Sequence, residues 1–138
     1  MAYWLVKTEA SAWSWDDQVK AGTTHWNGVR NYQASNNMKA MVLGERAFFY
    51  HSVDERRIVG IVEVVKLYYP DPSDESGRFG MVDFKAVAPM PNPVSLDMIK
   101  ADPALNHLAL VRQSRLSVVP VDDAAWRRIC DLGGVAPG

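Results

Sequence analysis

The chain has 138 residues and a formal net charge of −1, and 22% of its residues are charged. This length is typical of one domain built around one hydrophobic core. The balanced charge disfavours a protein that coats nucleic acid through bulk charge, although it permits a local basic patch. Because Cys130 is the only cysteine, an internal disulfide and a cysteine-based zinc site within one chain are excluded.

The N-terminal residues 1–9 show no pattern typical of secretion. The longest apolar run, residues 58–65, contains Gly60 and Glu63 and is too short to span a bilayer. We therefore expect a cytoplasmic protein that does not bind membranes.

Short runs of aromatic and β-branched residues alternate with helix-start signals along the chain. In chain order we expect a strand at 3–7, a helix from a Ser14 cap to Gly22, a helix after Asn31, strands at 47–52, 58–67 and 82–87, a helix capped by Asp102 with Pro103 at its first position, a strand at 116–121, and a last helix from Asp122 to Gly133.

Several residues refine this pattern. Gly60 predicts a bulge or a sharp bend within its strand. The segment 69–80 is dense in turn formers and predicts a long hairpin connection or a flexible loop. Pro120 predicts that the last strand lies at a sheet edge. Because strands outnumber substantial helices, we expect an α+β fold, with a small β-barrel or a strongly bent mixed sheet flanked by short helices.

The sequence contains no common enzyme signature such as a phosphate-binding loop with Lys, a G-x-S-x-G motif or an H-E-x-x-H motif. His25, His51 and His107 are scattered along the chain, and Cys130 falls on the apolar face of the last helix as a buried inert thiol. We therefore expect no catalytic residue, no metal site and no cofactor.

The most unusual stretch runs from His25 to Asn37. Trp26, Asn27 and Arg30 lie within five residues, next to a glycine. An aromatic ring offers a stacking face, an amide offers paired donors and acceptors for a base edge, and a guanidinium offers a planar fork for phosphate. The set is typical of a base-recognition pocket. The alternative is that Trp26 and Tyr32 are core aromatic residues and that Arg30 forms a surface ion pair.

Two further polar clusters are candidates. The segment 112–117 has two arginines and small or amide side chains that lead into a strand; its alternative is a solvated loop. The segment 50–52 ends an apolar strand, where alternation places Tyr50 and Ser52 on one face and His51 on the other. A hydrogen-bonded core histidine is the favoured role of His51 on these grounds.

Four motifs together resemble the EVE domain family. They are residues 3–9 (YWLVKTE), 26–34 (WNGVRNYQA), 49–52 (FYHS) and 111–118 (VRQSRLSV), in the order in which the family has them. The resemblance covers Tyr3 to about Leu132. It implies a PUA-like fold, a small bent β-barrel with short helices, and a protein that reads modified bases without catalysis, chiefly modified cytosines in DNA, with RNA ligands also considered.

The resemblance also implies the residues of the site. Trp26 is expected as a stacking wall or lid, Asn27 and Ser52 as readers of the base edge, and Tyr50 as a second wall. Arg30, Arg112 and Arg115 are expected to contact phosphate or the base edge. The full predicted ligand-binding set is Trp26, Asn27, Val29, Arg30, Asn31, Tyr32, Tyr50, His51, Ser52, Arg112, Gln113, Ser114, Arg115 and Ser117.

We therefore predict that residues 1–138 form a single EVE domain that binds nucleic acid carrying a modified base. The favoured ligand is a 5-modified cytosine flipped out of DNA, and DNA is favoured over RNA. A monomer is favoured. Two alternatives stay open: an RNA-binding accessory domain in translation or RNA modification, and a small enzyme for a nucleotide-like metabolite that uses Tyr50, His51 and Arg30.

Overall fold

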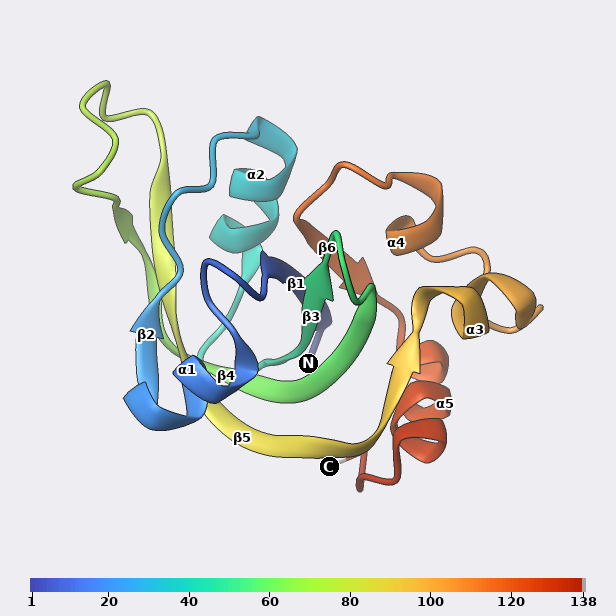
Figure 1. Cartoon of the computed structure of the whole chain (residues 1–138). Coiled ribbons are helices and arrows are strands. Elements are labelled where there is room, and N and C mark those ends of the chain that lie inside the picture. The colour runs from blue at the N-terminus through green and yellow to red at the C-terminus, as the bar shows by residue number, and fades with distance from the viewer. Residues whose placement is uncertain (138) are drawn as a thin grey trace.

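The computed structural model describes residues 1–137, which form a mixed α+β fold (Figure 1). Gly138, part of the predicted domain, lies outside the described residues. The strands are β1 (Tyr3–Glu9), β2 (Thr23–His25), β3 (Arg46–Ser52), β4 (Arg57–Pro70), β5 (Gly80–Ser95) and β6 (Val118–Val121). The helices are α1 (Trp15–Ala21), α2 (Tyr32–Ala40), α3 (Leu96–Ala101), α4 (Ala109–Arg112) and α5 (Asp123–Gly133).

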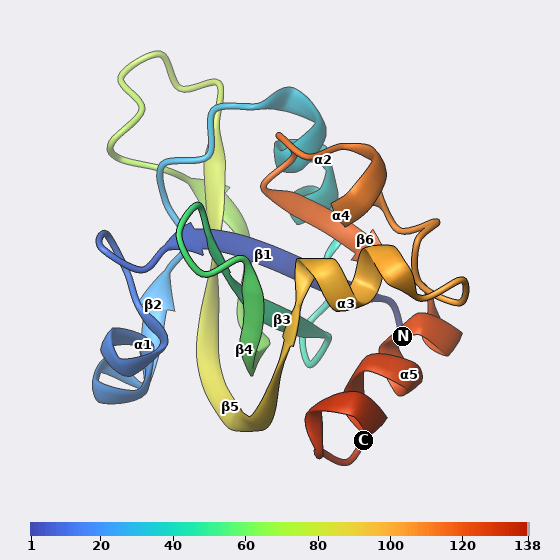
Figure 2. The same cartoon turned by 45° about the vertical axis from the view of Figure 1, so that its right-hand side comes forward.

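The strands described in residues 1–137 form one sheet in the order β2-β5-β4-β3-β1-β6. β1 and β3 are parallel, and the other neighbours are antiparallel. The sheet is strongly bent, with the long β4–β5 pair sweeping around one side in both views (Figures 1 and 2). It ends at β2 and β6, so the predicted barrel is a bent, unclosed sheet, and the edge position predicted for Pro120 is confirmed.

Next to Gly60 the register of β4 shifts against both neighbouring strands, β3 and β5. This confirms the predicted bulge. A Cβ atom at Gly60 would lie 2.5 Å from the ring of Trp15, so only glycine lets α1 pack this closely on the sheet. The Trp15 N–H donates a 3.0 Å hydrogen bond to Nε2 of His51, which fixes the start of α1 against β3.

The helix caps follow the sequence closely. Ser14 and Asp17 form a reciprocal capping box at α1, and the side chains of Asn31 and Asp122 cap α2 and α5.

On α5 the apolar stripe that ends at Cys130 is fully buried. Burial raises the pKa of the Cys130 thiol to about 11, as expected for an inert thiol.

Two local predictions were wrong. Asp102 does not begin a helix; it ends α3, whose N-cap is Ser95. Its carboxylate accepts hydrogen bonds from the backbone N–H of Ala104 in the following turn and from the guanidinium of Arg128 on α5. The Asx turn competes with helix formation here. The sequence analysis also missed β2, which starts directly after Gly22 and pairs with β5.

None of the helices within residues 1–137 has the length and apolar character needed to cross a membrane.

Candidate nucleic-acid interface

Neighbouring cavities open where β1 ends. Cavity 1 has a volume of about 550 Å³ and is lined mainly by the end of β1, Trp13 and residues 24–30. Cavity 2, about 650 Å³, lies between β1, the β3–β4 turn, α3 and the segment before β6. Both include Lys7, Thr8 and Ser117 in their lining, so they adjoin at the end of β1 and at the residue before β6. Cavity 3, about 330 Å³, lies between the start of α2 and residues 112–116.

The segment 26–30 forms one wall of cavity 1, and tertiary contacts hold it in place. The Trp26 backbone N–H donates a 2.8 Å hydrogen bond to the carbonyl of Val82 on β5. Gly28 then adopts φ +82°, a left-handed conformation that glycine favours. In that conformation the Gly28 N–H donates a 2.8 Å hydrogen bond to the carboxylate of Asp71.

Asp71 is a buried charge that organises this wall. Its side chain is 0% exposed, and it accepts hydrogen bonds from Ser73 and from the Arg30 guanidinium, whose Nη1 is 3.1 Å away. Burial alone would raise the pKa of Asp71, but the hydrogen bonds from Ser73, Gly28 and Arg30 outweigh it and hold the pKa at about 2. The β4–β5 connection is therefore the predicted hairpin connection, and these hydrogen bonds tie it to the segment 28–30.

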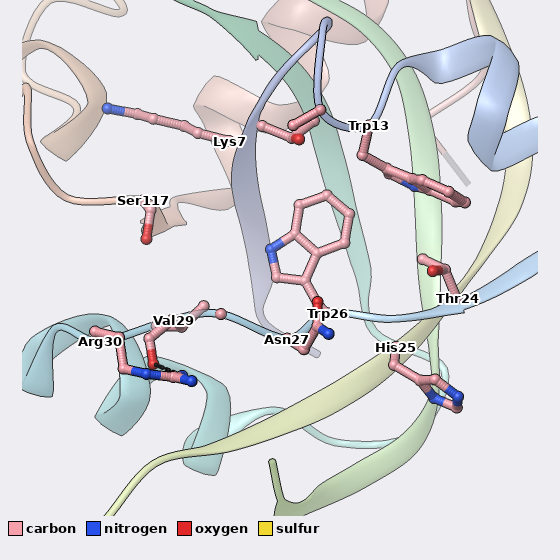
Figure 3. A pocket seen from close by; sticks show the side chains of 12 residues that line it. Lys7, Trp13, Thr24, His25, Trp26, Asn27, Val29, Arg30 and Ser117 are labelled. Atoms are coloured by element: carbon pink, nitrogen blue, oxygen red, sulfur yellow. Dashed lines mark hydrogen bonds between the residues drawn. The ribbon is translucent and has the colours of Figure 1, made fainter. Parts of the chain in front are cut away.

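Trp26 is mostly buried but borders the cavity. It is 7% exposed and packs edge-to-face against Phe49 and Phe84, with centroid distances of 5.6 and 5.5 Å. None of the hydrogen bonds described in residues 1–137 uses its indole N–H, and no buried polar atom there lacks a partner, so this N–H is open to the cavity. Figure 3 shows the indole nitrogen on the side of Ser117 and Lys7. In this structure Trp26 therefore forms a wall of cavity 1 that offers a hydrogen-bond donor, packed between Phe49 and Phe84.

Trp13 lines cavity 1 although the sequence analysis did not include it in the predicted site. Its indole N–H donates a 3.0 Å hydrogen bond to Oε1 of the buried Gln18, which orients the ring. The ring is half-buried and lines cavity 1 on the side of Trp26 away from Ser117 (Figure 3). An indole anchored through its N–H with part of its surface exposed is suited to stacking on a flat ligand. The one sequence signal that could have drawn attention to Trp13 is its position directly before the predicted helix cap Ser14.

His25 occupies the outer rim of cavity 1. Its Nδ1 lies 3.0 Å from the carboxylate of Asp83 and 2.8 Å from the hydroxyl of Tyr69. Burial, helped by the hydrogen bond to Asp83 and the negative charge of that carboxylate, raises the pKa of Tyr69 to about 12. The network fixes the imidazole through Nδ1 and leaves its other nitrogen toward solvent.

Cavity 2 concentrates positive charge. Lys7, Arg56, Lys100 and Arg115 line it, whereas Glu9 is the acidic residue of the lining. The Lys7 ammonium donates a 3.0 Å hydrogen bond to the carbonyl of Ser114, and burial lowers the pKa of Lys7. A chain with a net charge of −1 therefore gathers cations beside cavity 1.

The structure distributes the predicted residues over these three cavities. Tyr32 and His51 lie outside the linings, and the two nitrogens of the His51 ring bond the Trp15 N–H and Glu55. Cavity 1 takes Trp26, Asn27, Val29, Arg30 and Ser117; cavity 2 takes Tyr50, Ser52, Ser114, Arg115 and Ser117; and cavity 3 takes Asn31, Arg112, Gln113, Ser114 and Arg115. Cavity 1 is also lined by two residues of the candidate stretch that the predicted ligand-binding set omitted, His25 and Gly28. The residues that the sequence analysis missed in this cavity are Lys7, Thr8, Ala12, Trp13 and Thr24.

A bent, unclosed mixed sheet with short helices and cavities at the end of its first strand defines a PUA-like α+β domain. An ASCH protein from Zymomonas mobilis shares this fold at 10% identity, with a TM-score of 0.57 and coverage of 94% of this chain and 97% of that chain. The EVE domain family model matches residues 2–132, and the chain belongs to the EVE domain family. The resemblance seen in the sequence is confirmed.

Proteins of similar sequence and structure are found in animals and bacteria. Rat thymocyte nuclear protein 1 is 34% identical over 170 positions, which cover 98% of this chain and 75% of the relative. A crystal structure from Agrobacterium tumefaciens is 47% identical, with a TM-score of 0.96 and coverage of 99% of this chain and 95% of that one. Human THYN1, solved in complex with DNA containing 5-methylcytosine, is 32% identical, with a TM-score of 0.88 and coverage of 99% and 100%.

Proposed function

We propose that this protein is a non-catalytic reader of a 5-modified cytosine in DNA, and that cavity 1 holds the flipped base. The observation that carries the proposal is the free Trp26 N–H, which faces a cavity of about 550 Å³ beside a second indole. The complex of human THYN1 with DNA containing 5-methylcytosine supports the same ligand class for this family member.

Flipping a base out of a duplex costs a few kcal/mol, which the cavity must recover. Stacking on Trp13 contributes about 1–3 kcal/mol, the range typical of base–aromatic contacts. The Trp26 N–H, the Asn27 amide and the Ser117 hydroxyl offer donors and acceptors for the base edge. Because Trp26 and Gly28 are fixed by the fold, little conformational entropy is lost when the ligand binds.

Cavity 2 suits the sugar–phosphate backbone on one side of the flipped nucleotide. Its cations adjoin cavity 1 through Lys7, Thr8 and Ser117. Phosphate contacts position a strand without reading its sequence, whereas contacts with the base edge carry the specificity. We therefore assign recognition of the base to cavity 1 and electrostatic attraction to cavity 2.

The preference for a modified cytosine over cytosine depends on the free energy that contacts with the modification contribute to binding. Burial of one methyl group contributes about 0.8 kcal/mol, which gives a several-fold preference for 5-methylcytosine over cytosine. A larger preference requires a hydrogen bond to the modification, as a hydroxymethyl group would allow.

The enzyme alternative needs Tyr50, His51 and Arg30 around one substrate. Tyr50 lines cavity 2, Arg30 lines cavity 1 while paired with Asp71, and the buried His51 ring is engaged by Trp15 and Glu55. These groups do not converge, which favours a binding role.

The test is a titration of the protein with otherwise identical single strands that carry cytosine, 5-methylcytosine or 5-hydroxymethylcytosine, alongside the matching RNA strands. We expect a saturable, salt-sensitive complex that is strongest with a modified DNA strand. Trp13→Ala should weaken it about ten-fold or more. Leu43→Ala, at an exposed position in the turn before β3 and outside the linings of the three cavities, should leave it unchanged. Equal affinity for all DNA strands, tighter binding of RNA, or a chemically altered strand by mass spectrometry would overturn the proposal.

A further inference from the structure

A pair of aromatic side chains stands beside cavity 1 and outside its lining. Tyr32, at the first position of α2, packs against Phe79 with a centroid distance of 4.9 Å and an interplanar angle of 40°. Tyr32 is 61% exposed, although an aromatic side chain of this size is normally largely covered. We call Tyr32 and Phe79 the aromatic platform.

The loop that carries Phe79 is rigidly built. The Asp74 carboxylate accepts a 2.7 Å hydrogen bond from the Phe79 N–H and further bonds from the Ser76 N–H and hydroxyl. At the other end of the loop, Asp71 ties the chain to Gly28 and Arg30. A stacking surface that is already ordered loses little entropy when a ligand binds to it.

Arg30 joins the platform to cavity 1. Its guanidinium lines cavity 1 and also lies 5.9 Å from the centroid of the Phe79 ring. On the other flank, the neighbours of Tyr32 in the chain, Asn31 and Gln33, line cavity 3 together with Arg112. Figures 1 and 2 both show the segment before α2 running between the β4–β5 loop and the body of the fold. The platform is therefore continuous with the proposed base site.

The charge of this surface indicates what kind of group it receives. The loop carries Asp74, Glu75 and Arg78, so it is not a basic patch for phosphate. On the other flank of Tyr32, cavity 3 is lined by two cations, Arg112 and Arg115. This arrangement suits the flat face of a base on the rings, with the adjoining backbone running toward the arginines.

We infer that the aromatic platform stacks the unpaired base next to the flipped cytosine, an inference that rests on the proposed function of cavity 1. Stacking uses the π face that every base has, so the platform adds affinity without adding sequence preference. A neighbouring base is available for stacking only when it is not held in a duplex. The protein therefore prefers single-stranded or locally melted DNA over the same site in a stable duplex.

The experiment uses a short DNA strand with 5-methylcytosine and the fluorescent base 2-aminopurine on its 5′ or its 3′ side. Stacking quenches 2-aminopurine, so binding of the wild-type protein should quench the fluorescence at one of the two positions. Tyr32→Ala should abolish that quenching and weaken strand binding about ten-fold. Tyr32→Phe, which keeps the ring, should preserve both.

A mononucleotide separates this inference from the proposed function. 5-Methyldeoxycytidine monophosphate reaches cavity 1 but has no neighbouring base, so Tyr32→Ala should bind it as the wild-type protein does. If the strand binds the wild type and Tyr32→Ala equally, and neither 2-aminopurine position is quenched, the inference fails while the proposed function stands. If neither the strand nor the mononucleotide binds the wild-type protein, both fail. Thermal unfolding of Tyr32→Ala verifies that the variant is folded.

Discussion

Gly28 and Asp71 are 43 residues apart in the sequence, yet the backbone N–H of Gly28 donates a 2.8 Å hydrogen bond to the buried Asp71 carboxylate. The same carboxylate holds Arg30, so a single acidic residue of the β4–β5 loop shapes the wall of cavity 1. The candidate site thus depends on a contact between two segments that the chain keeps far apart.

The first prediction concerns Asp71 and pH. The pKa of Asp71 falls from its ordinary value of 3.8 to about 2 in the fold, so the folded state favours the ionised carboxylate. This contribution to the free energy of unfolding is fully present above about pH 4 and is lost as the pH falls through 2. Asp71→Asn should lower the free energy of unfolding by about 2 kcal/mol at pH 7, and the difference from the wild type should shrink toward pH 2.

Urea unfolding at several pH values measures this difference. Asp54→Asn, at an exposed position of the β3–β4 turn, is the matched control and should show no such pH-dependent loss. A constant difference between Asp71→Asn and the wild type from pH 7 to pH 2 would contradict the ionised, buried role of Asp71.

The second prediction concerns the donor of Trp26. Trp26→Ala would leave a void between Phe49 and Phe84, so the informative variant is Trp26→Phe, which keeps an aromatic ring and removes the N–H. Loss of one hydrogen bond should weaken binding of the methylated strand roughly three- to ten-fold. Trp126→Phe removes a buried indole on α5, remote from the cavities, and should not change affinity. Fluorescence titration of folded Trp26→Phe with unchanged affinity would show that the base does not meet this donor.

The third prediction concerns the arginines of cavity 3. If Arg112 and Arg115 contact phosphate, alanine at either position should weaken binding of every strand to a similar extent. Each substitution should also reduce the slope of log affinity against log salt concentration by about 1. Arg127→Ala, an exposed residue on α5, should leave the slope unchanged. A slope unaltered by Arg112→Ala would assign that side chain a role other than phosphate contact.

The fourth prediction concerns the bend of the sheet. Gly60→Ala places a Cβ atom 2.5 Å from the Trp15 ring, and should lower the free energy of unfolding by about 2 kcal/mol. The double variant Gly60→Ala with Trp15→Leu should be less destabilised than the sum of the two single changes, because the smaller side chain relieves the clash. Additive losses in chemical denaturation would show that the bend does not depend on this contact.

Much of the fold could be predicted from local patterns. Ser14, Asn31 and Asp122 cap helices because capping is a contact between residues three apart. Gly60 predicted a bulge for a similarly local reason. The helix start predicted at Asp102 was wrong because an Asp–Pro pair is compatible with both a helix start and a turn. The packing of α3 decides between the two. The short β2 escaped notice because its residues become a strand only by pairing with β5.

The candidate site, like the fold, could be predicted only in part from the sequence. Residue types alone made the segment from His25 to Asn37 a candidate for base recognition, but they equally allowed core aromatic residues and a surface ion pair of Arg30. The four motifs in the sequence determined the family. Tertiary structure decided that Trp26 packs against Phe49, that Trp13 lines the same cavity, and that Asp71 holds the wall of that cavity together. Those outcomes depend on burial and on contacts between distant segments, which only the folded chain creates.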